Sequence, residues 1–147
     1  MATILAHIRV HAGREADFEV VARALHDDSH RLDRGVRRYE YWRGAEAGLY
    51  YCLLAFDDFH AFLAHQTSDH HESASPKLAE LIHEIRLEWV DPVPGASPLP
   101  RTAMQPLPDG ADALTARYHR VFAARLQAWW ERVGGGEGPD SGRSGTH

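Results

Sequence analysis

The segment LYYCLLAF, residues 49–56, constrains the fold more than any other stretch, because its apolar residues do not alternate with polar ones. Side chains of a strand point alternately to the two faces of its sheet. Both faces here are apolar, with Tyr51, Leu53 and Ala55 on one and Tyr50, Cys52, Leu54 and Phe56 on the other. Helices of the same domain can cover one face only. We expect a second copy of the sheet, in a homodimer, or the C-terminal helix to cover the other.

Strand and helix patterns follow one another through the first 93 residues. Alternating apolar residues predict strands, and apolar residues spaced three or four apart predict helices. The expected elements are a strand at 3–10, a helix to about residue 32, a hairpin of strands at 36–43 and 49–56, a short helix after Asp57 or Asp58, a helix from Ser75-Pro76, and a strand at 85–91. This βαββαβ order predicts an α+β, ferredoxin-like fold.

The rest of the chain differs in composition. We expect the domain to occupy residues 1–93 and a proline-rich linker to occupy residues 94–110, since 92–110 hold six prolines and no periodic pattern. One added C-terminal helix is predicted at 111–133, with Phe122 and Trp129 close to one apolar stripe. The glycine-rich tail, 134–147, is predicted to be disordered.

Composition excludes several classes of function. The net charge of −5 and the absence of a basic stripe argue against nucleic-acid binding. No apolar run approaches the roughly 20 residues of a membrane span, and we expect no signal peptide. Cys52 is the only cysteine, which rules out an intrachain disulfide and favours the cytoplasm. One lysine beside fifteen arginines suggests a bacterial source with a GC-rich genome.

Four segments, ILAHIRVHAGREADFE, RYEYWR, YYCLLAFDDFHAFLAHQTSDHHE and LEWVDPV, together resemble the antibiotic biosynthesis monooxygenase domain over roughly residues 1–93. The most specific piece is His-x-x-Ser/Thr-x-His, here His65, Ser68 and His70, with Asp69 where the family often has proline. The resemblance implies a dimeric α+β barrel in a group that includes cofactor-free quinol and anthrone monooxygenases. It accounts for nothing in residues 94–147. The haem-degrading branch is not expected, because its Asn, Trp and His correspond to Ile8, Phe62 and about Ser75.

The histidines of HQTSDHHESASP, residues 65–76, admit three interpretations. In the first, His70 is a catalytic base supported by His65, because an imidazole pKa near ~6.5 suits proton abstraction from a phenol. In the second, both cap helix ends and are structural. In the third, His65, His70, His71 and Glu72 bind a metal, but their spacing is not i, i+4 on one helical face. We expect no metal and no cofactor.

A planar substrate would need an aromatic pocket. The residues expected to line it are His7, Tyr51, Tyr39, Phe62 and Trp89, although core and dimer-interface roles are open for the same side chains. The leading hypothesis is a cofactor-independent monooxygenase that oxidises a quinol or polycyclic phenol with O₂. The alternatives are a non-catalytic binding or accessory protein with the same fold and an isomerase of small hydroxyketones.

Overall fold

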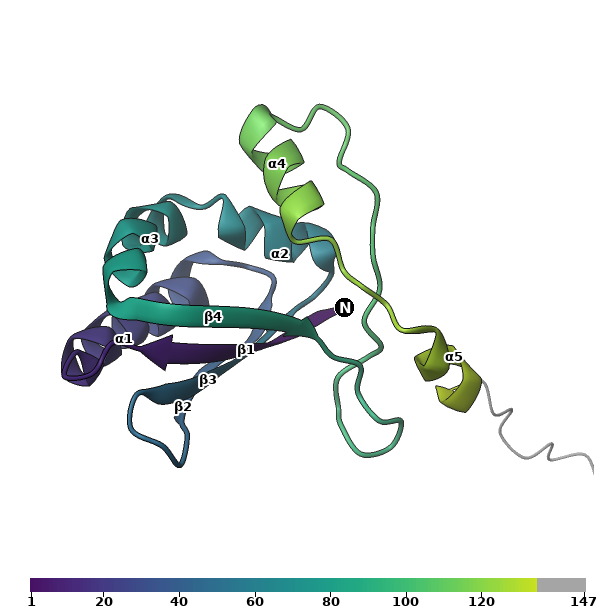
Figure 1. Cartoon of the computed structure of the whole chain (residues 1–147). Coiled ribbons are helices and arrows are strands. Elements are labelled where there is room, and N and C mark those ends of the chain that lie inside the picture. Colours follow the sequence, from purple (N-terminus) through teal and green to yellow (C-terminus); the bar gives the residue numbers. More distant parts are fainter. Residues whose placement is uncertain (135–147) are drawn as a thin grey trace, which may run out of the picture.

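The computed structural model describes residues 1–134. The elements are β1 (Ala2–Val10), α1 (Glu15–Leu32), β2 (Val36–Arg43), β3 (Leu49–Phe56), α2 (Phe59–Gln66), α3 (Asp69–Leu81), β4 (Ile82–Trp89), α4 (Ala113–Val121) and α5 (Ala128–Gly134). Of the tail predicted at 134–147, residue 134 alone lies within the described residues. The expected α+β, ferredoxin-like fold is confirmed (Figure 1).

The four strands form one antiparallel sheet in the order β2-β3-β1-β4. β1 and β3 lie in the middle of the sheet, so both of their edges are hydrogen-bonded to neighbouring strands. The even-numbered residues of β1 and β3 form the buried face, among them Ile4, Ile8, Cys52 and Phe56. No helix within residues 1–134 is both long and apolar enough to span a bilayer.

The helices α1, α2 and α3 all cover this one face (Figure 1). Phe18 and Leu25 of α1 and Phe62 and Leu63 of α2 are at most 2% exposed and complete the core. On the opposite face Leu5, Tyr51 and Leu53 remain half-buried, and Trp42 is 59% exposed. The apolar second face predicted from residues 49–56 is therefore only partly covered by residues 1–134.

The helix after the short helix begins earlier than predicted. The predicted helix start at Ser75-Pro76 is wrong, because α3 starts at Asp69 with Ser68 as its N-cap, whose hydroxyl accepts a hydrogen bond from the His71 backbone N–H. Pro76 then lies inside the helix rather than at its first position. Asp69 and Glu72 in the first turn favour this early start through the helix dipole. The fourth strand likewise begins at Ile82 rather than at residue 85.

The single C-terminal helix predicted at 111–133 is also incorrect, because residues 122–127 separate α4 from α5. The proline-rich segment before α4 contains no helix or strand, yet it is tied to the domain. Thr102 donates its hydroxyl to the Val90 carbonyl at 2.6 Å, and the Ala103 N–H donates to the Met1 carbonyl at 2.9 Å. α4 then packs against α2 of its own domain (Figure 1).

Candidate functional site

A cavity of about 380 Å³ lies between the helix-covered face of the sheet and the helices α2 and α3. Its volume falls in the range of small-molecule pockets. Ile4, Ala6 and Ile8 of β1 form part of an apolar wall, and Phe122 from the C-terminal segment forms another part. The polar side chains that reach the cavity are Tyr39, Tyr41, Cys52, His65, Gln66, His71, Ser75, His83 and Glu84.

His65 stands at the last turn of α2 and is 1% exposed. Its Nδ1–H donates to Asp33 Oδ2 at 2.7 Å, which leaves Nε2 as the unprotonated nitrogen of the neutral ring. Nε2 is buried and has no hydrogen-bond partner within residues 1–134. The Tyr39 and Phe56 rings, with centroids 5.1 and 5.3 Å away, hold the imidazole in place. His65 therefore offers an oriented lone pair in the wall of an apolar cavity.

Asp33 reaches His65 because the turn after α1 lies close to α2. Asp33 is the C-cap of α1, and a Cβ at Gly35 would collide with the Ala61 side chain of α2. Burial alone would raise the pKa of Asp33, but the hydrogen bond and charge of His65, followed by those of His70, lower it below its usual value. Asp33 is thus an ionised carboxylate that can stabilise a protonated His65.

His71 is the second imidazole of the cavity. Burial, and then the neighbouring His65, lower the pKa of His71 to about 4, so its ring is neutral at pH 7. The two rings are 4.8 Å apart, and His71 Nδ1 is also buried without a hydrogen-bond partner in the described chain. From the sequence, His71 was expected only as a possible metal ligand. The signal it missed was the Ser68 N-cap, which sets the direction of each side chain in the first turn of α3.

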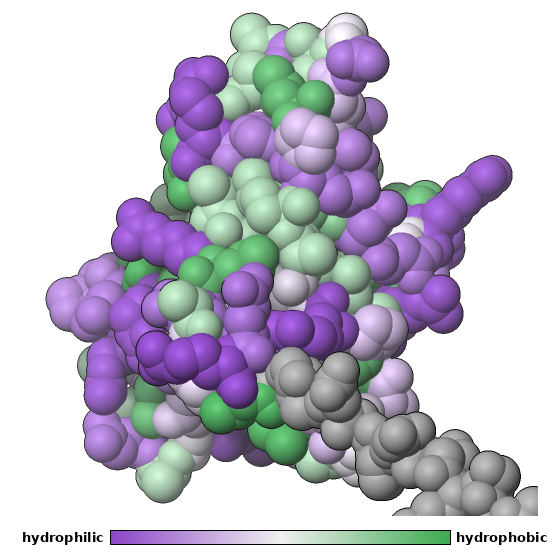
Figure 2. Space-filling model, turned by 90° about the vertical axis from the view of Figure 1, so that its right-hand side faces the viewer, coloured by the Kyte–Doolittle hydropathy of each residue, from purple (hydrophilic) through white to green (hydrophobic). Residues whose placement is uncertain are grey.

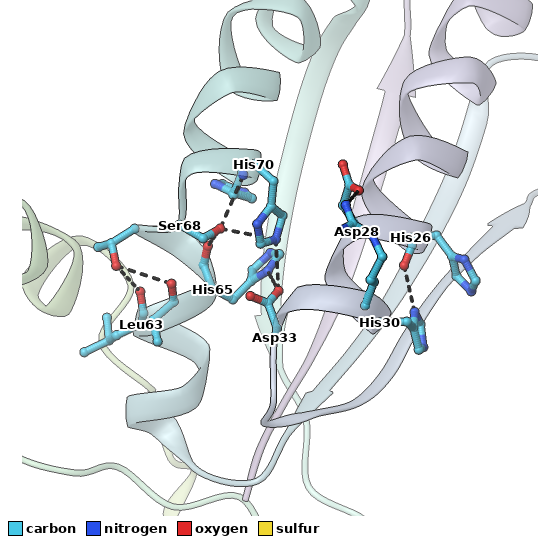
Figure 3. A network of polar contacts seen from close by, with 12 residues as sticks. His26, Asp28, His30, Asp33, Leu63, His65, Ser68 and His70 are labelled. Atoms are coloured by element: carbon cyan, nitrogen blue, oxygen red, sulfur yellow. Dashed lines mark hydrogen bonds and ion pairs between the residues drawn. The ribbon is translucent and has the colours of Figure 1, made fainter.

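The His70 side chain points away from this cavity. Its Nε2 lies 3.0 Å from Asp33 Oδ2 and 3.2 Å from Ser68 Oγ, and it lines a separate hollow beside the end of α1 (Figure 3). Both histidines of the motif His65, Ser68 and His70 therefore contact one carboxylate, that of Asp33, and Ser68 contacts His70. The structure brings His65 to the cavity and places His70 behind it.

The carboxylate and the two imidazoles also offer the donor atoms of a metal site. Asp33, His65 and His70 each offer an atom within 4.8 Å of the others, and two imidazoles with one carboxylate suit Zn or Fe. Both imidazole nitrogens, however, lie at hydrogen-bonding distance from the same carboxylate oxygen. This geometry fits two N–H donors on one acceptor without an ion.

The other predicted pocket residues divide between the two faces of the sheet. Tyr39 and Phe62 line the cavity, and Trp89 lines an adjacent cavity of about 330 Å³. His7 and Tyr51 do not reach either one, because odd-numbered residues of β1 and β3 point away from the helices. There the His7 ring packs 5.5 Å from the Tyr51 ring, and its Nε2 lies 3.0 Å from Glu88 Oε2.

Burial raises the pKa of Tyr39 and Tyr41, so that both phenols stay protonated at neutral pH. Protonated phenols can donate hydrogen bonds, whereas neutral His71 and the unpartnered Nε2 of His65 can accept them. Within residues 1–134 the cavity wall therefore combines aromatic and aliphatic groups with a few polar atoms of both kinds. Such a wall suits a planar molecule that carries hydroxyl or carbonyl groups.

The fold and this cavity define a small ferredoxin-like α+β domain with one buried imidazole, His65, and one half-buried imidazole, His71, between sheet and helices. The family described as antibiotic biosynthesis monooxygenase matches residues 1–77, more than half of the chain. The chain belongs to this family. No curated protein matches it.

Several solved structures share the fold. PA3566 from Pseudomonas aeruginosa is 22% identical, with a TM-score of 0.58 over 63% of this chain and 93% of its own. A proposed antibiotic biosynthesis monooxygenase from Caulobacter crescentus is 22% identical, with a TM-score of 0.60 over 63% and 89%. Rv0793 from Mycobacterium tuberculosis is 18% identical, with a TM-score of 0.59 over 65% and 98%. At these identities the likeness establishes the fold alone.

Proposed function

We propose that this protein is a cofactor-independent monooxygenase that oxidises a quinol or polycyclic phenol with O₂ in the cavity between the sheet and α2 and α3. The observation that carries the proposal is the buried, unpartnered Nε2 of His65, backed by the ionised Asp33 on its other nitrogen. This arrangement is that of a general base whose tautomer is fixed by a carboxylate.

In the proposed reaction the substrate places an acidic hydroxyl or ring C–H against His65 Nε2. Proton transfer forms an imidazolium, which Asp33 stabilises at 2.7 Å. The electron-rich anion then reduces O₂. One oxygen atom becomes a carbonyl on a ring carbon, and the other leaves as water with the hydrogen of that carbon and the hydrogen of the phenol hydroxyl, so that the substrate supplies all the electrons and no external reductant is needed.

The remaining side chains of the site would position the substrate. Neutral His71 accepts a hydrogen bond from a second hydroxyl, and Tyr39 and Tyr41 donate to the oxygen that becomes negative. His70, which the sequence suggested as the base, is proposed to act through Asp33 by holding the carboxylate against His65. The half-covered opposite face, with Tyr51 and Leu53, is proposed to pair with a second copy in a homodimer.

Oxygen uptake with a panel of quinols and anthrones tests the proposal. Wild type, His65→Gln and His70→Gln are compared with the surface control His30→Gln, each after a check of folding by circular dichroism. His65→Gln should lose roughly 10²–10⁴-fold in turnover, the usual contribution of a positioned base. His70→Gln should lose less, and His30→Gln should match wild type.

The other outcomes separate the alternatives. Equal uptake by wild type and His65→Gln would remove His65 from the mechanism. Tight binding of the phenols without uptake would indicate a binding or accessory protein, and conversion without O₂ would indicate an isomerase. Uptake abolished by a chelator would identify Asp33, His65 and His70 as a metal centre instead.

A further inference from the structure

The segment after β4 contributes to the cavity although it lies outside the residues that the family matches. The match ends at residue 77, and the three solved structures described above cover 63% to 65% of the chain. The described part of the added segment returns over α2 and places Phe122, the C-cap of α4, on the cavity wall. Figure 2 shows apolar surface (green) running from the projection that carries α4 onto the body of the domain.

Hydrogen bonds from two consecutive residues in the second half of α4 hold this helix to the domain. The Tyr118 hydroxyl donates to Glu72 Oε1 of α3 at 2.5 Å. His119 Nε2 lies 3.0 Å from the Gln105 carbonyl oxygen, and the Gln105 side chain accepts the His60 N–H at 3.0 Å. Tyr118 and His119 thus hold α4 to α3 and, through Gln105, to α2. Phe122 follows one turn after Tyr118, so these contacts set the position of its ring.

Phe122 lies between two cavities. Ile4, Phe62, Leu87 and Phe122 line both the cavity of about 380 Å³ that holds the imidazoles and the adjacent cavity of about 330 Å³. These four residues therefore form the partition. Ile4 and Phe62 are at most 1% exposed core residues, and Leu87 is fixed in β4. Phe122 is the half-buried member, packed edge-on against Phe62 at 5.9 Å and against Tyr118 at 5.4 Å.

We propose that Phe122 is a specificity-determining residue, which limits the size of the aromatic substrate by closing the imidazole cavity toward its neighbour. The inference rests on the proposed phenol site and adds a size class to it. With Phe122 in place the site is confined to the cavity of about 380 Å³. Without its ring the two spaces join, and a larger polycyclic phenol gains apolar contact that a small one cannot use.

Two fluorescent phenols of different size test this inference in the full chain. The dissociation constants of 2-naphthol, with two rings, and 1-hydroxypyrene, with four, are measured under nitrogen so that no oxidation interferes. Phe122→Ala should improve the affinity for 1-hydroxypyrene relative to 2-naphthol by about tenfold or more, the usual effect of fitting additional apolar groups into a pocket. Phe122→Leu, which keeps most of the partition, should shift the ratio much less.

Leu126→Ala is the matched control, because Leu126 belongs to the same segment, is 45% exposed and lines neither cavity. Its ratio should equal that of wild type. An unchanged ratio in folded Phe122→Ala, or an equal change in Leu126→Ala, would overturn the inference alone. Failure of every variant to bind either phenol would overturn it together with the phenol site. A shifted ratio in a protein that consumes no O₂ would support the inference and refute only the oxygenase.

Discussion

The pH dependence of stability should depend on His71. Its pKa is about 4 in the native protein, because burial and the neighbouring His65 disfavour the charged ring, against 6.5 for a free histidine. Between these two values the unfolded chain binds a proton that the native protein does not bind. The free energy of unfolding therefore falls as the pH is lowered from about 6.5 to about 4. At 1.36 kcal/mol per pH unit the loss is about 3 kcal/mol.

Urea unfolding followed by tryptophan fluorescence, at pH values from about 7 to about 4, measures this loss. His71→Gln keeps a neutral polar side chain and should not show it, so wild type and variant should diverge by about 3 kcal/mol over this range. Carboxylates that titrate in the same range act equally in both proteins and cancel. His30→Gln, on the exposed face of α1, should follow wild type. Parallel curves for wild type and His71→Gln would show that His71 is not held neutral by the cavity.

Asp33→Asn should reduce turnover by at least about 10²-fold and cost about 1–3 kcal/mol of stability. The pKa of Asp33 is lower in the native protein than its usual value of 3.8, so this stabilisation is fully present above pH 3.8 and is lost as the pH falls through the native pKa. The melting curves of variant and wild type should therefore converge in acid but differ at pH 7. A chain that ends at Ala111 lacks α4 and α5 and should melt at a lower temperature, since Phe62 loses the cover of Phe122; an unchanged melting curve would contradict this docking. Leu53→Glu should convert the expected dimer to a monomer in sedimentation velocity, whereas Val20→Glu, on the exposed side of α1, should leave the dimer intact. A wild-type monomer at micromolar concentration would refute the homodimer.

Three of the four strands could be placed closely from the sequence because alternation is a local property, whereas the fourth begins three residues earlier than predicted. Residues 36–43 and 49–56 match β2 and β3 residue for residue, and β1 differs by one residue. The start of α3 was missed because Ser75-Pro76 has the form of a helix start, whereas the earlier cap at Ser68 carries no proline to mark it. The helix break at 122–127 has no glycine or proline either, and no local pattern indicates it.

The site was predicted in part for the same reason. Neighbouring residues on a helix point about 100° apart. Because the start of α3 was misplaced, His70 was expected at the cavity, where the structure has His71. His7 and Tyr51 lie on the sheet face away from this cavity, and the sequence does not state which parity of β1 and β3 the helices cover. Asp33 could not be found at all, since it meets His65 only through a contact 32 residues apart in the chain.

The central claim is that His65 Nε2 takes a proton from a phenol bound in the cavity. A chromophoric phenol such as 4-nitrophenol reports this directly, because its absorption shifts on ionisation. Bound under nitrogen at a pH where the free phenol is protonated, it should show the phenolate band with wild type and His30→Gln but not with His65→Gln, although all three bind it. Bound phenol that remains protonated in wild type, or a phenolate band of equal strength in His65→Gln, would contradict the claim.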